Sequence, residues 1–369
     1  MEPTEKHRIY WHLALSRVPN VGPVTVKTLL DYFGDPKTVF LQDRGNLGKF
    51  MRSNAIDSLL DYDPEKDTFI NDELAKIEDK DVTILTPIDK EYPKLLRSIL
   101  DPPSILYVRG EVQPKDEIAV GIVGTRRATR YGIDQAKRFA EYLAGQGLTV
   151  VSGMAMGIDG NAQESAINAG GRTIAALGCG VDIVYPSINK KLYDNIVEHG
   201  AIVSEYPMGT QPTPENFPKR NRIISGLSLG VLVIEGGVKS GALITYKYAL
   251  DQGREVFAIP GPIDRPTSEG PNMLIQKGAT VVTDPSQIID YLNIPTKSKE
   301  ARRKALDVAD SLQGIEKVLF DVLDYDGKHI DIIARETKMD SQHVLMTLSM
   351  LELRDLVKRL PGMNFAKNV

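Results

Sequence analysis

Residues 118–127 read IAVGIVGTRR, a buried-strand run that ends in a glycine turn and two arginines. A strand, a glycine turn and a following helix are the parts of a phosphate-binding site, because backbone N–H groups and the helix N-terminus hold the anion. Dinucleotide-binding turns carry Gly-x-Gly-x-x-Gly and little charge, whereas Gly121 and Gly124 give only Gly-x-x-Gly. Arg126 and Arg127 add two permanent cations, and guanidinium groups suit phosphate oxygens. The turn therefore predicts an anionic ligand and disfavours a dinucleotide.

The pattern of buried strand and helix recurs through the middle of the chain. Apolar runs without polar alternation stand at 118–123, 148–151, 173–177, 201–203, 230–234, 255–259 and 279–282. Helical stretches between them include 133–145, 161–169, 187–198 and 241–252. This alternation predicts an α/β domain, with a doubly wound, mostly parallel, Rossmann-like sheet covered on both faces, over residues 81–293. Several of the runs end in glycine turns, so we expect a ligand cradle at the carboxyl ends of the strands.

The segment before the sheet domain, residues 1–80, reads as short helices. Its turn around Gly22, followed by an apolar helix, resembles a helix-hairpin-helix/SAM-like domain. Such a turn can offer N–H groups to a DNA phosphate. The alternative is a helical packing module without a ligand.

The segment after the sheet domain resembles a winged helix. A polar linker at 294–313 leads into residues 314–369, which read as three helices and a hairpin. The third helix carries Gln342, His343 and a late Arg354 among acidic and apolar residues. Base readout in a major groove is therefore disfavoured, and a protein-contact or regulatory role competes with it.

Composition limits the possible ligands and chemistry. The 369-residue chain has a net charge of −4, so any nucleic-acid binding has to come from a local basic patch. The single cysteine, Cys179, argues against an internal disulfide framework and a cysteine-rich zinc site, and the five histidines lack metal-ligand spacing. Because no signal peptide or membrane-spanning run is visible, we expect a cytoplasmic protein with no membrane contact, metal or cofactor.

A second basic stretch, ENFPKRNR at 215–222, leads into a predicted helix. Lys219, Arg220 and Arg222 are expected near the helix start, where cations oppose the macrodipole and a bound polyanion relieves that conflict. Phe217 adds an aromatic face, and this combination can stack bases while cations follow the backbone. The alternative is that Phe217 packs against the helix and the cations face water.

Two other glycine turns bear on the chemistry. In SGMAMGIDG (152–160), Gly153 allows close approach of a ligand, and Asp159 is either a helix N-cap or a ribose contact. EGGVKSGALIT (235–245) resembles the Pro-Gly-Gly-x-Gly-Thr-x-x-Glu signature of nucleotide phosphoribohydrolases, but Glu235 replaces the proline and the catalytic glutamate is missing. Glycosidic hydrolysis needs a positioned carboxylate. We therefore predict no catalytic residues, with a nucleotide-processing enzyme as the alternative.

Taken together, the motifs resemble one family. GIVGTRRAT, SGMAMGID, ALGCGVDIVYP, SEYPMGT, FPKRNRIISGLS, VIEGGVKSGALIT and FAIPGP stand in the order of the DNA-processing protein A family, called DprA or Smf. The resemblance runs through about 92–290. It implies a bacterial cytoplasmic protein that binds single-stranded DNA during natural transformation, protects it from nucleases and loads a RecA-type recombinase onto it. It also implies a homodimer formed through the sheet domain and no established enzymatic activity.

The resemblance also assigns candidate binding residues. The Gly-Thr/Ser-Arg motif falls on Gly124, Thr125 and Arg126, and the Phe-Pro-x-Arg-Asn-Arg motif begins at Phe217. With the basic and glycine residues discussed above, the predicted single-stranded-DNA-binding set is Gly124, Thr125, Arg126, Arg127, Gly153, Phe217, Lys219, Arg220, Asn221 and Arg222. In this hypothesis the cations neutralise successive phosphates, N–H groups near the glycines donate hydrogen bonds, and the phenylalanine contacts a base or sugar.

Overall fold

The computed structural model describes residues 3–294, 311–325, 327–354 and 356–368. The chain divides into two units, 1–294 and 295–369, each treated separately below. The linker predicted at 294–313 lies almost entirely outside the described residues. The helical segment and the sheet domain predicted before it both belong to the first unit, so the boundary between them stays a prediction.

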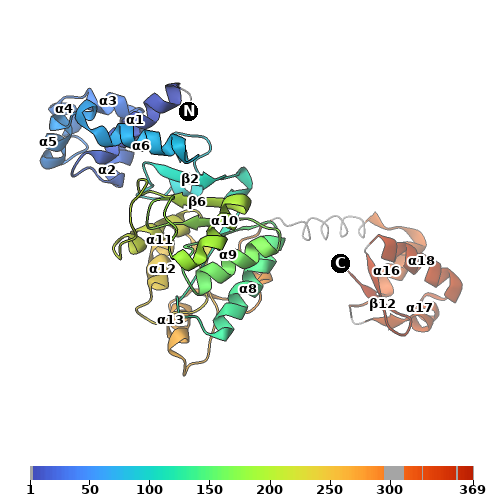
Figure 1. Ribbon diagram of the computed structural model, residues 1–369. Helices are drawn as coiled ribbons and strands as arrows, with labels where there is room; N and C mark the ends of the chain where they lie inside the picture. The colour runs from blue at the N-terminus through green and yellow to red at the C-terminus, as the bar shows by residue number, and fades with distance from the viewer. Residues whose placement is uncertain (1–2, 295–310, 326, 355, 369) are drawn as a thin grey trace. The chain divides into compact units, whose positions relative to one another are not determined.

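A nine-stranded sheet forms the centre of the first unit (Figure 1). Its strand order is β1-β2-β6-β5-β4-β3-β7-β8-β9, and all neighbours from β6 to β9 pair in parallel. The strands are β1 Thr83–Leu85, β2 Leu106–Gly110, β3 Ala119–Val123, β4 Thr149–Ser152, β5 Thr173–Ala176, β6 Gly200–Ser204, β7 Gly230–Val233, β8 Glu255–Ala258 and β9 Thr280–Val281. Each predicted apolar run overlaps one of these strands, which confirms the predicted sheet. The antiparallel edge formed by β1 and β2 was not predicted.

Helices cover both faces of the sheet, which explains why β3, β4 and β5 are buried along their whole length. Figure 1 shows α8 and α9 on one side and α11 and α12 on the other. Side chains alternate between these two layers, so that Val150 packs with α8 and α9 while Val151 belongs to the core under α11 and α12. The helices of this layer structure are α7 Lys94–Arg97, α8 Arg130–Gly145, α9 Ile158–Asn168, α10 Lys190–His199, α11 Asn216–Gly226, α12 Gly241–Asp251, α13 Pro266–Gln276 and α14 Ser286–Tyr291, with the short 3-10 turns η2 Pro114–Glu117 and η3 Ser187–Asn189.

The N-terminal segment is helical, as the sequence predicts. Its helices are α1 Pro3–Arg17, α2 Pro23–Phe33, α3 Pro36–Phe40, α4 Arg44–Leu47, α5 Ser53–Asp61 and α6 Thr68–Asp79, with the 3-10 turn η1 Pro64–Lys66. A short turn joins α1 to α2, and Asn20 in it has a left-handed φ of 63°. Leu13 of α1 and Leu74 of α6 share a core with Tyr107 of β2, so these two helices pack directly on the sheet. DNA contact at the turn stays a prediction.

The switch point of the sheet lies between β3 and β7. From β3 the chain continues to β4, β5 and β6 on one side, and then returns to add β7, β8 and β9 on the other. The backbone N–H of Thr125, just after β3, donates to the carbonyl of Glu235, just after β7, at 2.8 Å. Ligands of doubly wound sheets bind at the carboxyl ends of the strands beside this point.

The described part of the second unit is a winged helix, as predicted. Its elements are α16 Gly314–Val322, β10 Lys328–His329, α17 Ile330–Thr337, α18 Ser341–Leu353, β11 Val357–Leu360 and β12 Asn364–Lys367, and the sheet order is β10-β12-β11. Val344, Leu348 and Leu351 of α18 face the core. On the opposite side of α18, Met346 and Leu353 are exposed together with Gln342, and the helix carries no Lys or Arg, the side chains that most often contact bases in a DNA-reading helix.

Candidate nucleic-acid interface

A groove of about 720 Å³ opens at the switch point, beyond the carboxyl ends of β3 and β7. It brings together residues that are widely separated in the sequence. From the predicted binding set it is lined by Gly124, Thr125, Arg126, Arg127, Phe217, Arg220 and Asn221. The other three members, Gly153, Lys219 and Arg222, do not line it.

At the mouth of the groove, the Phe217 ring contacts one exposed cation and a second aromatic ring, and the buried Arg220 guanidinium lies 5.9 Å from the centroid of the Phe217 ring. The guanidinium of Arg126 lies 5.0 Å from the ring centroid of Phe217, and that ring stacks on Tyr185 at 5.4 Å with an interplanar angle of 30°. Arg126 and Arg127 are exposed, and neither forms an ion pair with a carboxylate among the described residues. Tyr185 was missed as a site residue, although it stands in the VDIVYP motif that contributed to the family resemblance. These groups can bind phosphate and stack on a base.

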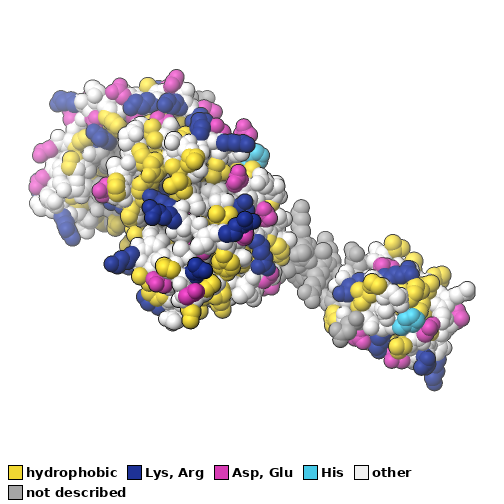
Figure 2. Space-filling model, turned by 60° about the horizontal axis from the view of Figure 1, so that its bottom comes forward, with side chains coloured by type: hydrophobic (Ala, Val, Ile, Leu, Met, Phe, Trp, Pro, Cys, Tyr) yellow, Lys and Arg dark blue, Asp and Glu magenta, His cyan; other side chains and the backbone are white. Residues whose placement is uncertain are grey.

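Figure 2 shows that basic side chains form separate patches between apolar and uncharged surface on the visible face. This distribution suits a chain of net charge −4 whose binding depends on local geometry.

Arg220 lies in the floor of the groove and not on its surface. It is 4% exposed, and its guanidinium donates to the carbonyl oxygens of Ala176 and Gly153. Burial lowers its pKa, and the negative charge of Asp159 acts in the opposite direction. Arg220 therefore contributes a fixed positive charge below the mouth, held by backbone carbonyls.

Asp159 and Gly153 bind each other, which changes the role expected of both. The Asp159 carboxylate accepts from the Gly153 N–H at 3.1 Å, so this N–H is not free to hold a ligand, contrary to our expectation. The N-cap interpretation of Asp159 is wrong, because Gly157 is the N-cap of α9. Burial raises the pKa of Asp159, and the charge of Arg220 opposes that rise. A ribose contact by Asp159 stays a prediction.

Arg222 departs most from its expected position. It is 4% exposed, with Nη2 2.6 Å from Glu205 Oε2 and Nε 3.0 Å from Asp101 Oδ2. The reason is that α11 begins at Asn216, earlier than the sequence suggested, so that Arg222 lies well inside the helix. In place of the expected phosphate contact, the Arg222 guanidinium forms ion pairs with these two carboxylates.

The remaining two members of the basic stretch differ in exposure. Asn221 is 9% exposed; its side chain donates to the Gly241 carbonyl at 3.2 Å and accepts from Arg220 Nε at 3.2 Å. Lys219 is exposed but outside the groove lining. Of the cations in this stretch, only Lys219 is available to solvent.

The glycine turns after β3 and β4 pack against each other through Gly157. This residue has a left-handed φ of 78°, and a Cβ added to it would overlap the carbonyl oxygen of Thr125. We expect Gly157→Ala to displace the turn that carries Arg126 and to cost clearly more than about 1 kcal/mol of stability in urea denaturation. Gly170→Ala is the matched control, because Gly170 has a φ of 72° with nothing within 4 Å of the added Cβ. Equal losses in the two variants would contradict the overlap argument.

The groups that resemble catalytic residues have structural partners. Glu235 is 2% exposed and accepts from the backbone N–H and the hydroxyl of Thr129, at 2.9 and 2.6 Å. Burial raises the pKa of Cys179 to about 11, so its thiol stays protonated at neutral pH. Within the described residues there is no group of three or more histidine, cysteine or acidic side chains suited to a metal ion. No helix in the same ranges is long and apolar enough to cross a bilayer.

The fold and the groove define a class of protein. It is a doubly wound α/β protein with an arginine-bearing glycine turn at its switch point and a winged helix in a separate unit. Comparison with known proteins narrows this class. Residues 83–293 match the family described as DNA recombination-mediator protein A, and residues 303–363 match the DprA winged helix domain. The chain belongs to the DprA/Smf family of DNA-processing proteins.

The relatives cover most of the chain. Protein Smf of Synechocystis sp. is 34% identical over 97% of this chain and 98% of its own length. DprA of Bacillus subtilis is 41% identical over 59% of this chain and 74% of its own length. Among solved structures, DprA from Streptococcus pneumoniae has a TM-score of 0.65 and 33% identity, and covers 77% of this chain and 97% of its own. DprA from Helicobacter pylori, whose structure describes a single-stranded DNA binding mode, has a TM-score of 0.52 and 33% identity, and covers 57% and 95%.

Proposed function

We propose that this protein binds single-stranded DNA, without sequence preference, in the switch-point groove. The observation that carries the proposal is the mouth of the groove, where the exposed guanidinium of Arg126 lies over the ring of Phe217, which stacks on Tyr185, and exposed Arg127 lines the same groove. Arginines follow the phosphates while aromatic faces accept any base, so this combination favours a strand over a defined sequence. Family membership and the single-stranded DNA bound by the Helicobacter pylori relative support it.

The proposed roles follow the observed exposure. Arg126 and Arg127 neutralise phosphates, the N–H groups near Gly124 and Thr125 donate to phosphate oxygens, and the rings stack on bases. Arg220 adds a positive potential from the floor. Lys219 is a cation outside the groove that a longer strand could reach.

The wider biological role is part of the same proposal. A protein that coats single strands would shield them from nucleases and present them to a RecA-type recombinase during natural transformation or recombination. We further propose that it works as a cytoplasmic homodimer, which places two grooves on one strand. Membership of the DprA/Smf family supports these assignments.

Binding rather than catalysis is proposed for the groove. The carboxylate at the phosphoribohydrolase-like motif, Glu235, is buried and braces the start of α8 through Thr129. Asp159 lines the groove, but its carboxylate already accepts a hydrogen bond from the Gly153 N–H. Neither carboxylate is placed as a free acid–base group, as glycosidic hydrolysis requires.

The test is fluorescence anisotropy with single- and double-stranded oligonucleotides of equal length at about 50 and 200 mM salt. We expect the single strand to bind more tightly, with log affinity falling by about 0.7 per phosphate contact for each unit of log salt. Preference for the duplex would contradict the proposal and direct attention to the winged helix. Release of free base from a mononucleotide would instead support the enzymatic alternative.

A further inference from the structure

One wall of the groove is a loop, residues 205–215, which joins β6 to α11. It has no helix or strand of its own, yet Pro212 and Pro214 from it line the groove and it leads directly to Phe217. The position of this loop therefore determines where the stacking ring and the groove wall stand. Its conformation has to be fixed by contacts from other parts of the chain.

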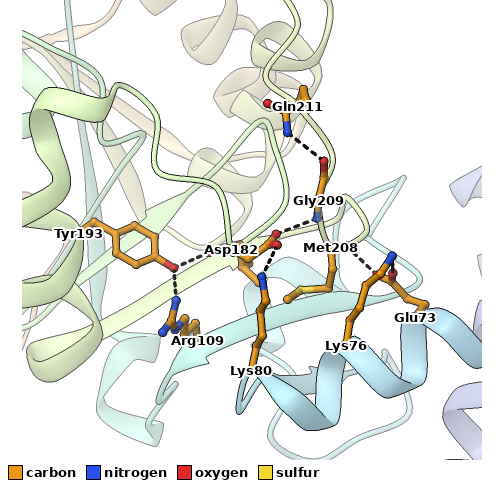
Figure 3. Close-up of polar contacts among 10 residues, drawn as sticks. Glu73, Lys76, Lys80, Arg109, Asp182, Tyr193, Met208, Gly209 and Gln211 are labelled. Carbon is orange, nitrogen blue, oxygen red and sulfur yellow. Dashed lines mark hydrogen bonds and ion pairs between the residues drawn. The ribbon is translucent and has the colours of Figure 1, made fainter.

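Helix α6 of the N-terminal segment supplies the first of these contacts. Its buried stripe consists of Ile70, Glu73, Leu74 and Ile77, so a carboxylate occupies a position that the helical repeat reserves for an apolar side chain. Glu73 is 0% exposed, and its Oε1 accepts from the backbone N–H of Met208 at 2.6 Å (Figure 3). Lys76 lies one turn further along, with Nζ 3.7 Å from the other carboxylate oxygen.

Lys80, just beyond the end of α6, supplies the second contact through Asp182. Its Nζ is 3.1 Å from Asp182 Oδ2, and Asp182 Oδ1 accepts from the Gly209 N–H at 2.8 Å (Figure 3). The next residue, Thr210, accepts from the Gly180 N–H at 2.9 Å. Three successive residues of the loop are thus fixed at its middle, directly before the prolines of the groove wall.

Glu73 is a charged residue type in a position that is unfavourable for charge. Burial raises its pKa, and the Met208 N–H, the Tyr107 side chain and the charge of Lys76 only partly oppose that rise. An ionised carboxylate in a core position costs free energy that a hydrophobic residue of similar size would not. The free-energy cost of burying the Glu73 carboxylate has an explanation if its hydrogen bond to the Met208 N–H holds the loop in the position that binding requires.

We infer that Glu73 and Lys80 are positioning residues for the strand-binding groove, through which the N-terminal helices hold the groove wall without touching the strand. The inference rests on the proposed function of the groove. It assigns the N-terminal segment a role in DNA binding that differs from phosphate contact by its helix-hairpin-helix-like turn.

The test combines strand affinity, its salt dependence and hydrogen exchange of the loop in the full chain. Glu73→Ala is expected to weaken single-stranded DNA binding about tenfold with the salt slope unchanged, because no phosphate contact is lost. Exchange in residues 206–212 should become faster. Glu73→Gln should restore most of the affinity, since its amide oxygen still accepts from the Met208 N–H. Glu78→Ala, on the exposed side of the same helix and paired with Lys6, is the matched control.

Lys80→Ala keeps the test decisive if Glu73→Ala does not fold, because Lys80 is a partly exposed surface residue. It should weaken binding by a smaller factor with the same unchanged slope. Wild-type affinity in a folded Glu73→Ala or Lys80→Ala variant would overturn the inference, as would a reduced salt slope. If the wild-type protein fails to bind single strands, the proposed function is wrong. Separately, unchanged hydrogen exchange of residues 206–212 in Glu73→Ala would show that Glu73 does not position the loop.

Discussion

Arg126→Ala is expected to weaken single-stranded DNA binding by about tenfold to a hundredfold, a range that follows from the loss of one hydrogen bond to a charged group. The variant loses a phosphate contact, and it also loses the cation that lies 5.0 Å from the Phe217 ring. The slope of log affinity against log salt should fall by about 0.7. Stability should change little, because the side chain is exposed and forms no ion pair within the described part of the chain.

The control for this variant is Arg138→Ala. Arg138 belongs to α8, the helix that follows the same turn, but its guanidinium pairs with Asp284 outside the groove. The Arg138→Ala substitution removes one positive charge from the protein without removing a groove cation, so the slope of log affinity against log salt should stay at the wild-type value. An equal loss in both variants would mean that net charge drives binding. An unchanged affinity in Arg126→Ala would remove the central assignment.

The fold was predictable because it depends on periodicity over many residues. Each buried run from 118–123 to 279–282 overlaps a strand of the sheet, and the three helices and hairpin after residue 314 form the winged helix. The antiparallel strands β1 and β2 were not predicted. β1 covers only Thr83–Leu85 and leaves little periodic signal, whereas β2, Leu106–Gly110, is as long as β3, so its length does not explain why it was missed.

The site was predictable in its location and less so in its individual contacts. The glycine turn after β3 and the basic stretch meet at the switch point, as topology requires. The sequence shows that a residue is basic but does not show which side chains surround it in the fold, so Arg126 and Arg222 look equivalent in the sequence. One is exposed at the groove mouth and the other is enclosed by Glu205 and Asp101. Glu73 carried a usable signal, since it interrupts an apolar stripe of α6.

The environment of Arg222 leads to a prediction about stability. Arg222→Ala should lower the free energy of unfolding by about 3–5 kcal/mol near neutral pH, because it leaves the Glu205 carboxylate buried without its partner. Urea denaturation measures this loss. A double variant that adds Glu205→Gln should recover much of it, since no buried charge then remains. A folded Arg222→Ala variant of wild-type stability with a salt slope reduced by about 0.7 would instead restore the original interpretation of Arg222 as a phosphate contact.

The pH dependence of this loss has a defined sign. Burial raises the pKa of Glu205 above its ordinary value, and Arg222 opposes that rise. A carboxyl whose folded pKa is raised binds its proton more tightly in the folded state, so it favours folding at low pH and this contribution disappears as pH rises through the folded pKa. Without Arg222 the pKa of Glu205 should rise further. The destabilisation by Arg222→Ala should therefore be largest at neutral and alkaline pH and shrink as Glu205 becomes protonated, whereas a loss that grows on acidification would show that the ion pair is not its cause.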